Sequence, residues 1–193
     1  MPADIRNLRT LREGRDIVNR SEHFGTGQST PRAVVKIDDL TKSHIGEGWD
    51  RADLVNYVTL VDFYDGGLFK ETTPNIAGRL RTSSMVTIDM VELIIRRDEQ
   101  LPVYRMKLIN GDIIEQITIQ VLDNVKGVYQ TAYQYVYSDN LFEVVQTHPQ
   151  DSDLVVIGFR TRTVEITQMP RDNEGLLLGN VSSTFNTETG QNQ

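Results

Sequence analysis

Hydrophobic and polar residues alternate with a period of two along most of the chain after Arg32. This period predicts β-strands with one buried face, because successive side chains of a strand point to opposite sides. We expect strands at residues 33–38, 54–64, 85–96, 103–109, 113–122, 128–137, 141–146 and 154–167. The predicted fold class is therefore mainly β, a small antiparallel barrel or sandwich.

Turn sequences and the residues that share a strand face refine this prediction. Asp65-Gly66-Gly67 is typical of a turn, and Asn110-Gly111 predicts a two-residue hairpin, because both central positions of such a turn need positive φ. The alternation predicts four sets of residues that each share a face: Val91, Leu93 and Ile95; Tyr104, Met106 and Leu108; Ile113, Ile117, Ile119 and Val121; and Tyr129, Tyr133, Tyr135 and Tyr137.

One segment of the body has a helical pattern. Thr72-Thr73-Pro74 is a start signal, with a hydroxyl cap and a proline in the first turn. Ile76, Ala77 and Leu80 then form one face, until Ser83-Ser84. We expect one short helix here, of about two to three turns, packed alongside the strands.

The chain divides into an appendage and a body. Residues 1–32 form a predicted N-terminal arm and linker, in which Ile5, Leu8 and Leu11 recur at helical spacing before a stretch rich in glycine and serine. Such an arm is either disordered alone or ordered against a partner. Residues 33–190 form a single barrel-like domain, and 191–193 a polar tail.

Composition narrows the class of protein. The 193 residues carry a net charge of −7 and contain no cysteine, which excludes thiol catalysis, cysteine metal sites and disulfides. The negative charge disfavours nucleic acid and anionic lipid as partners. No apolar run approaches the roughly 18 residues that span a bilayer, and we expect a soluble protein made in the bacterial cytoplasm.

Motifs for catalysis are missing from the sequence. There is no G-x-S-x-G or H-E-x-x-H, and the loop at 25–30 lacks the lysine of a phosphate-binding loop. The three histidines stand apart, and Asp151-Ser152-Asp153 is typical of a polar turn. Asp89 and Glu92 lie in an otherwise apolar strand, where either carboxylate is a candidate for burial, although such residues more often face a second subunit or a solvated channel. We expect no enzyme, no cofactor and no metal site.

Two sets of residues are candidates for a subunit interface. Tyr133 and Tyr135 belong to an aromatic set that favours packing in the core or between subunits over stacking on nucleic acid. Arg160 and Arg162 share one face of a strand whose other face carries threonines. A strand that is polar on both faces suits a contact with a neighbouring subunit or the wall of a wet lumen.

Several segments, taken in order, resemble the Hcp family, the tube-forming proteins of type VI secretion that share a fold with contractile phage tail tubes. The segments that carry the resemblance are 35–40 with the loop at 41–53, the helix start at 70–76, the strands at 93–98 and 104–110, and 162–167 with the turn at 172–175. The arm at 1–32, the stretch 121–137 and the insert at 147–153 depart from the family pattern.

The resemblance implies ring-forming subunits that stack into the inner tube of a contractile injection machine. It implies interfaces in place of catalytic residues: strand edges that pair around the ring, and a loop bearing Trp49, Asp50 and Arg51 that reaches a neighbour. The arm would contact an adjacent ring, a sheath or a baseplate protein. The assembled tube would be part of a virion or of an injection machine. The subunit would also be secreted with the tube.

The residues leave two other classes open. One is another virion component, such as a capsid, connector or baseplate subunit, which would assemble with different partners. The other is a monomeric β-barrel binding module that uses the tyrosines. Both differ from the tube subunit in oligomeric state, which light scattering measures directly.

Overall fold

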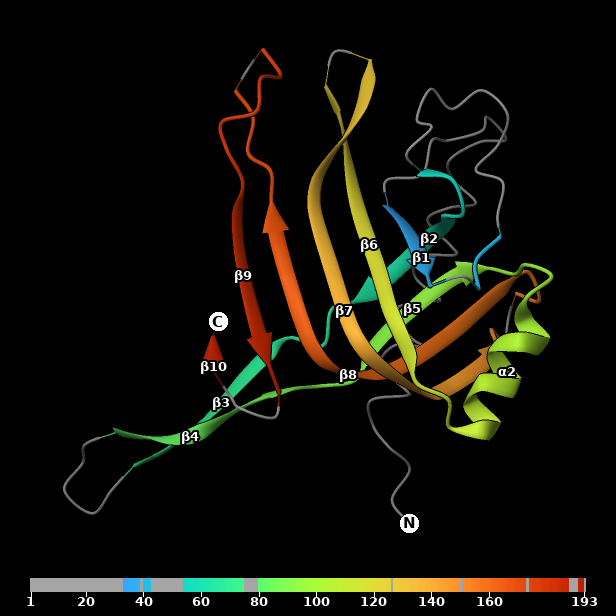
Figure 1. Ribbon diagram of the computed structural model, residues 1–193, viewed down its shortest axis with the longest axis horizontal. Helices are drawn as coiled ribbons and strands as arrows, with labels where there is room; N and C mark the ends of the chain where they lie inside the picture. The colour runs from blue at the N-terminus through green and yellow to red at the C-terminus, as the bar shows by residue number, and fades with distance from the viewer. Residues whose placement is uncertain are drawn as a thin grey trace.

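The computed structural model describes residues 33–38, 40–42, 54–74, 80–125, 127–149, 151–172, 174–187 and 191–192. Antiparallel strands dominate this part of the chain (Figure 1). They are β1 (Ala33–Ile37), β2 (Val58–Tyr64), β3 (Leu68–Pro74), β4 (Leu80–Ile88), β5 (Val91–Arg96), β6 (Ile114–Val125), β7 (Val128–Thr147), β8 (Leu154–Gln168), β9 (Val181–Asn186) and β10 (Gln191–Asn192), with helix α2 (Leu101–Asn110) between β5 and β6. The predicted mainly β fold is confirmed.

Six of the strands close into a barrel. β1 pairs with β2 and β6, β5 joins β2 to β8, and β7 joins β8 back to β6. The circuit β1–β2–β5–β8–β7–β6 therefore has no open side, which settles the choice between barrel and sandwich. Closure protects the backbone groups that an open edge would leave unpaired.

β8 is long enough to pair with different neighbours along its length. Its first half pairs with β5 and β7, so that Ile157 lies between Leu93 and Val145. Its second half pairs with β7 and β9, so that Ile166 lies between Tyr135 and Ser183. Beyond the barrel, β6, β7, β8 and β9 therefore continue as a four-stranded sheet (Figure 1).

The core fills the barrel from all sides. Val91, Leu93 and Ile95 on β5 are buried in it, as the alternation predicts. β5 also buries its outer face, where Ile94 packs with Val156 of β8. A strand buried on both faces carries a nearly continuous apolar run, and β5 reads accordingly.

The helix lies at a different place from the predicted one. Residues 72–74 belong to β3 and 80–83 to β4, while Ile76 and Ala77 lie outside the described residues, and the helix α2 replaces the strand predicted at 103–109. Leu101 and Tyr104 are buried and Leu108 packs on the same core, which is helical spacing. Because Tyr104 and Leu108 fit either period, the strand prediction was wrong; Met106, predicted to point inward, is 53% exposed.

The ends of α2 account for the Asn110-Gly111 signal. Pro102 stands in the first turn, where its missing N–H has no intrahelical partner to lose. Gly111 has φ +69°, and its N–H donates to the carbonyl of Leu108 at 3.3 Å. The predicted hairpin was wrong because a helix end needs the same positive φ that a tight hairpin needs.

Other local predictions have mixed outcomes. The turn at 65–67 is confirmed, and a Cβ at Gly66 would lie 2.7 Å from the Asp89 carbonyl, so only glycine fits. The strand predicted at 85–96 breaks at Asp89 and Met90, and the two predicted at 128–137 and 141–146 form the single strand β7. Asn192, in the predicted polar tail, pairs with Phe185.

Candidate assembly surfaces

The predicted interface residues fall into two groups. Trp49, Asp50 and Arg51 lie outside the described residues, as does the N-terminal arm. Tyr133 and Tyr135 lie on β7 and the two arginines on β8, an adjacent strand. Arg160 pairs in register with Leu141, six residues along β7 from Tyr135, or about 20 Å. The tyrosines and the arginines therefore belong to different parts of the surface.

The tyrosines lead from the core to the surface. Tyr137 is fully buried, with its ring edge-on to Phe159 at 5.4 Å, and it stacks on Tyr135 at 6.3 Å. Burial raises the pKa of both phenols, and the charge of Asp65 adds to this. Tyr133 is 39% exposed.

Tyr129 leaves this set. A register shift after Val121 turns it to the outer face of the sheet, where it packs beside Tyr57 and Leu122. The prediction that all four tyrosines share a face was therefore wrong. A bulge adds one residue to one strand and so reverses the alternation of its faces. Beyond the bulge, spacing along the sequence no longer predicts which face a side chain lies on.

The two arginines make cross-strand ion pairs. Arg160 Nε lies 2.7 Å from Glu143 Oε1, and Arg162 Nη1 lies 3.4 Å from Asp139 Oδ2. About half of each arginine side chain is exposed. Exposed pairs of this kind contribute at most about 1 kcal/mol to stability. They therefore leave this face hydrated and charged without adding much to the barrel.

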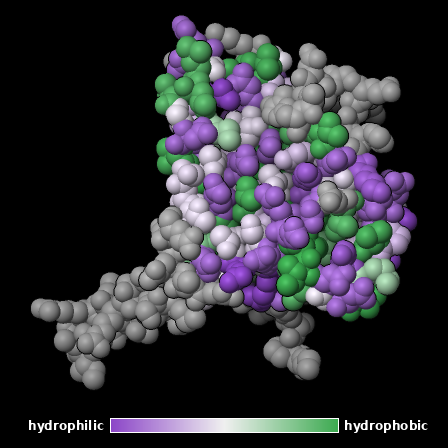
Figure 2. Space-filling view, in the orientation of Figure 1, coloured by the Kyte–Doolittle hydropathy of each residue, from purple (hydrophilic) through white to green (hydrophobic). Residues whose placement is uncertain are grey.

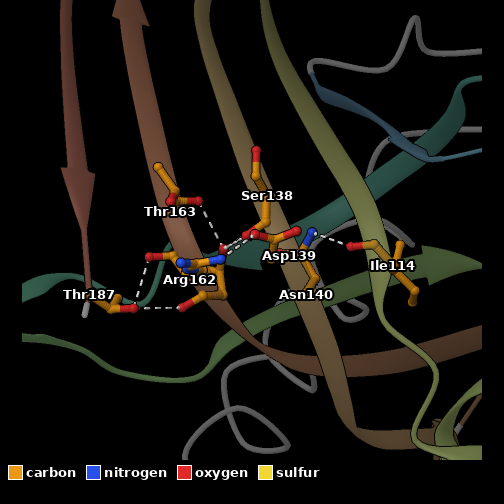
Figure 3. A network of polar contacts seen from close by, with 8 residues as sticks. Ile114, Ser138, Asp139, Asn140, Arg162, Thr163 and Thr187 are labelled. Atoms are coloured by element: carbon orange, nitrogen blue, oxygen red, sulfur yellow. Dashed lines mark hydrogen bonds and ion pairs between the residues drawn. The ribbon is translucent and has the colours of Figure 1, made fainter. Parts of the chain in front are cut away.

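A sharp bend crosses three strands beside the second pair (Figure 3). In a regular strand the residues of the buried face are two apart, but here consecutive buried residues are three apart. The pairs are Ile117 and Ile114 on β6, Tyr137 and Asn140 on β7, and Val164 and Thr161 on β8. The side-chain faces therefore reverse on all three strands at one level. Of the two residues passed over on each strand, Glu115, Asp139 and Arg162 are exposed, and Asp139 has φ +56°.

The bend also explains an incorrect face on β6. The alternation predicted Ile113 to point inward with Ile117 and Ile119, but Ile113 is 66% exposed and Ile114 is buried instead. The change of spacing between Ile114 and Ile117 is a sequence signal of such a bend. This signal can be interpreted only when the neighbouring strands are known to reverse their buried faces at the same point.

Polar side chains, two of them buried, satisfy the backbone at the bend. Asn140 Nδ2 donates to the carbonyl oxygens of Ile114 at 3.1 Å and Tyr137 at 3.0 Å (Figure 3). The hydroxyl of Thr161 lies 3.0 Å from the carbonyl oxygen of Ser138, and that of Thr187 donates to Arg162 O at 2.8 Å. These bonds hold the corner at which the barrel passes into the four-stranded sheet.

The outer face of the four-stranded sheet is polar and almost uncharged. We call it the polar face. Cross-strand register places its residues in three rows, and all of them except Val136 and Glu165 carry a hydroxyl or an amide. The rows are Gln116, Ser138, Thr163 and Asn186; Thr118, Val136, Glu165 and Thr184; and Gln120, Gln134, Thr167 and Ser182. The opposite face carries core residues such as Val164 and Phe185.

The β3–β4 hairpin is a separate two-stranded sheet. Its register runs from Leu68 opposite Ile88 to Pro74 opposite Leu80. Among the described strands, β3 and β4 pair only with each other. Figure 1 shows the pair projecting away from the barrel, beyond the end of β9. It is the most extended feature of the described chain.

Possible metal ligands do not gather in the described part of the molecule. No cluster of three or more His, Asp or Glu side chains suited to a metal occurs there. None of its helices is long and apolar enough to cross a membrane. His148 is buried in the β7–β8 turn, and Asp151 Oδ1 accepts the N–H of Asp153 at 2.8 Å, an ordinary polar turn.

Comparison with known proteins gave matches by structure alone. No protein-family model matches the chain, and no curated protein matches its sequence. A solved type six secretion system protein superposes with a TM-score of 0.69 at 13% identity, over 83% of this chain and 98% of that one.

Two proteins named Hcp1 also match. Hcp1 from Salmonella typhimurium has a TM-score of 0.60 at 14% identity, over 83% of this chain and 97% of its own. Hcp1 from E. coli EAEC 042 has a TM-score of 0.58 at 12% identity, over 81% and 99%. At such identities the likeness concerns the backbone and extends over most of the described body. The chain therefore has a divergent Hcp-like fold.

Proposed function

We propose that this chain is a structural subunit that assembles into rings, which stack as the inner tube of a contractile injection machine. The machine is a type VI secretion system or a related phage tail. The fold is that of the secretion proteins described above. The observation that carries the proposal is the projecting β3–β4 hairpin.

The hairpin requires a partner on physical grounds. An isolated two-stranded hairpin is marginally stable in water, because two strands bury too little surface to offset the cost of ordering them. This one pairs with no other described strand. Contact with the next subunit supplies the missing surface. Repeating that contact by rotation closes a ring.

The polar face supplies a suitable wall for the lumen. Hydroxyl and amide side chains keep a sheet hydrated, and the near absence of charge limits binding to passing polypeptide. The other face of the same sheet is committed to the core. We place the polar face toward the axis of the ring for this reason.

The remaining contacts follow from the same assembly. The segment with Trp49, Asp50 and Arg51 contacts a neighbouring subunit, and residues 1–32 contact an adjacent ring, a sheath or a baseplate protein. The charged face with Arg160 and Arg162 lies at a hydrated border of the ring. The subunit acts as a structural component without catalysis, is made in the bacterial cytoplasm, and is released with the tube.

Light scattering tests the proposal. The full chain is measured by size-exclusion chromatography with multi-angle light scattering across a concentration series, followed by negative-stain microscopy. We expect a mass that is a multiple of the subunit mass and annular particles. A monomer at every concentration contradicts self-assembly and favours a subunit that needs different partners or a binding module.

A shortened hairpin makes the test specific. Residues 71–85 are replaced by Asn-Gly, which joins Lys70 to Val86, a pair that is already in register. We expect the thermal midpoint of the monomer to change little and rings to disappear. Rings of unchanged mass in this variant would show that the hairpin does not join the subunits.

A further inference from the structure

A loop at one end of the four-stranded sheet presents apolar side chains to water. Leu176, Leu177 and Leu178 are 64%, 49% and 68% exposed, and Val181 and Val128, the first residues of β9 and β7, are 65% and 56% exposed. We call these five residues the leucine tip. Figure 2 shows the hydrophobic residues gathered at the upper end of the molecule, over the β8–β9 loop and the β6–β7 turn.

Hydrogen bonds hold the loop in shape. Asp172 Oδ1 accepts the N–H groups of Glu174 at 2.9 Å and Leu176 at 2.8 Å, and Leu178 N–H donates to Pro170 O at 2.9 Å. Gly175, with φ +90°, lies against Val125 of the β6–β7 turn. An ordered loop that exposes three consecutive leucines is typical of a protein–protein contact.

A second apolar surface lies on helix α2. Val103, Met106 and Ile109 recur every three residues on the face opposite the buried Leu101 and Tyr104. Together with Ile113, just beyond the helix, we call them the helix patch; their exposed fractions run from 38% for Val103 to 72% for Ile109. In Figure 2 the hydrophobic residues at the lower right cover this part of the molecule.

The two surfaces lie at opposite ends of the same strands. Ile113 directly precedes β6, whose twelve residues end at Val125 beside the leucine tip. At about 3.3 Å per residue, β6 separates the surfaces by roughly 35 to 40 Å along its length. A contact between two different surfaces is heterologous, so it propagates from copy to copy without closing a dimer.

Charges at the rims favour pairing the two surfaces. Helix α2 carries Arg105 and Lys107 and no acidic residue, although Asp112 pairs with Lys107 at 3.1 Å. The leucine tip is bordered by Glu174 and Asp123, both exposed. Arg171 of the same loop is partly buried, and its Nη1 donates to Gly175 O at 3.2 Å, so the two exposed carboxylates outnumber one bound cation. A basic rim facing an acidic rim steers one surface to the other and opposes contacts between like surfaces.

We propose that the leucine tip of one subunit docks on the helix patch of a second copy of this chain, and that this contact joins successive rings along the tube. The proposal rests on the proposed function, since it takes ring formation as given. The hairpin then joins subunits within a ring, and the leucine tip joins one ring to the next.

Charge-exchange variants of the full chain test the contact. Leu177→Lys and Ile109→Glu each place an uncompensated charge in the apolar contact, and each alone should leave rings intact and prevent stacking. A buried unpaired charge should raise the concentration for stacking roughly 100-fold. The double variant carries both charges at the same contact and should regain stacks. Val55→Lys, at a residue 66% exposed outside both surfaces, is the matched control.

Light scattering and negative-stain microscopy count rings and stacks for each variant. Stacks as long as those of the wild type in both single variants overturn the inference, as do wild-type rings that never stack. Single variants that fail and are not rescued together show that the leucine tip docks elsewhere, on another surface or another protein. A wild-type chain without rings defeats the proposed function as well, so the two failures are distinguishable.

Discussion

Asn140 at the bend offers the sharpest test of the structure. Its side chain is fully buried and donates from Nδ2 to the carbonyl oxygens of Ile114 and Tyr137, on β6 and on its own strand β7. Asn140→Ala removes both donors and leaves two carbonyl oxygens in the interior without these partners. The substitution should therefore destabilise the domain without touching its hydrophobic packing.

The expected loss follows from the number of bonds. A buried carbonyl left without its partner costs about 1 to 1.5 kcal/mol, so two give a loss of about 2 to 3 kcal/mol in the free energy of unfolding. Gln116→Ala is the matched control, because Gln116 lies one level away on β6 and is exposed. Its expected change is within about 0.5 kcal/mol.

Urea unfolding followed by far-ultraviolet circular dichroism measures both variants. The measurement is repeated at several protein concentrations, because assembly also stabilises the folded state. Equal midpoints for Asn140→Ala and Gln116→Ala would refute the reasoning. They would mean that the bend does not depend on these hydrogen bonds.

Asn140→Asp adds a signature in pH. The carboxylate would face two carbonyl oxygens in the interior, so the folded state should favour the protonated form and raise its pKa above the ordinary value of about 3.9. The folded state then binds the proton more tightly than the unfolded chain does. The stability of this variant should fall as pH rises above about 4, in contrast to Asn140→Ala.

Three further predictions concern the core, a turn and alkaline pH. Ile117→Ala should cost about 3 to 4 kcal/mol in urea unfolding, and Ile113→Ala under about 0.5, because the bend buries only the first of these two isoleucines. Gly175→Ala should destabilise by about 1 kcal/mol more than Gly179→Ala, since both have positive φ but only the first meets a side chain, at 2.8 Å; equal thermal shifts would contradict this. Burial raises the pKa of Tyr137, so stability should fall as pH rises above about 10, and urea midpoints between about pH 8 and pH 11 should fall less in Tyr137→Phe.

Period-two alternation determined much of the barrel by itself. The run from Ala33 to Ile37 and the alternate residues Val91, Leu93 and Ile95 could be assigned correctly, because apolar residues at alternate positions mark the strand face that lines the core. The turn at 65–67 could also be predicted, since consecutive glycines are typical of backbone with positive φ. The resemblance to the Hcp family agreed with the fold, even though two of the segments that carried it were misassigned.

Those two segments show where local signals are ambiguous. Residues 70–76 resembled a helix start, but 70–74 belong to strand β3, and 104–110 resembled a strand but form the helix. Short apolar runs satisfy both periods, and Asn-Gly serves a hairpin or a helix end. What decided between them was the surface available for packing. Leu101 and Tyr104 reach the barrel core only from a helix.

Tertiary structure alone decided the features on which assembly depends. The bend required β6, β7 and β8 to change faces at one level, and no single strand determines its neighbours' register. The leucine tip and the helix patch became surfaces only when the strands between them set them at opposite ends. Alternation records whether a residue is buried within its own strand. The joining of distant strands determines which residues stay exposed together, because pairing is a property of the folded chain.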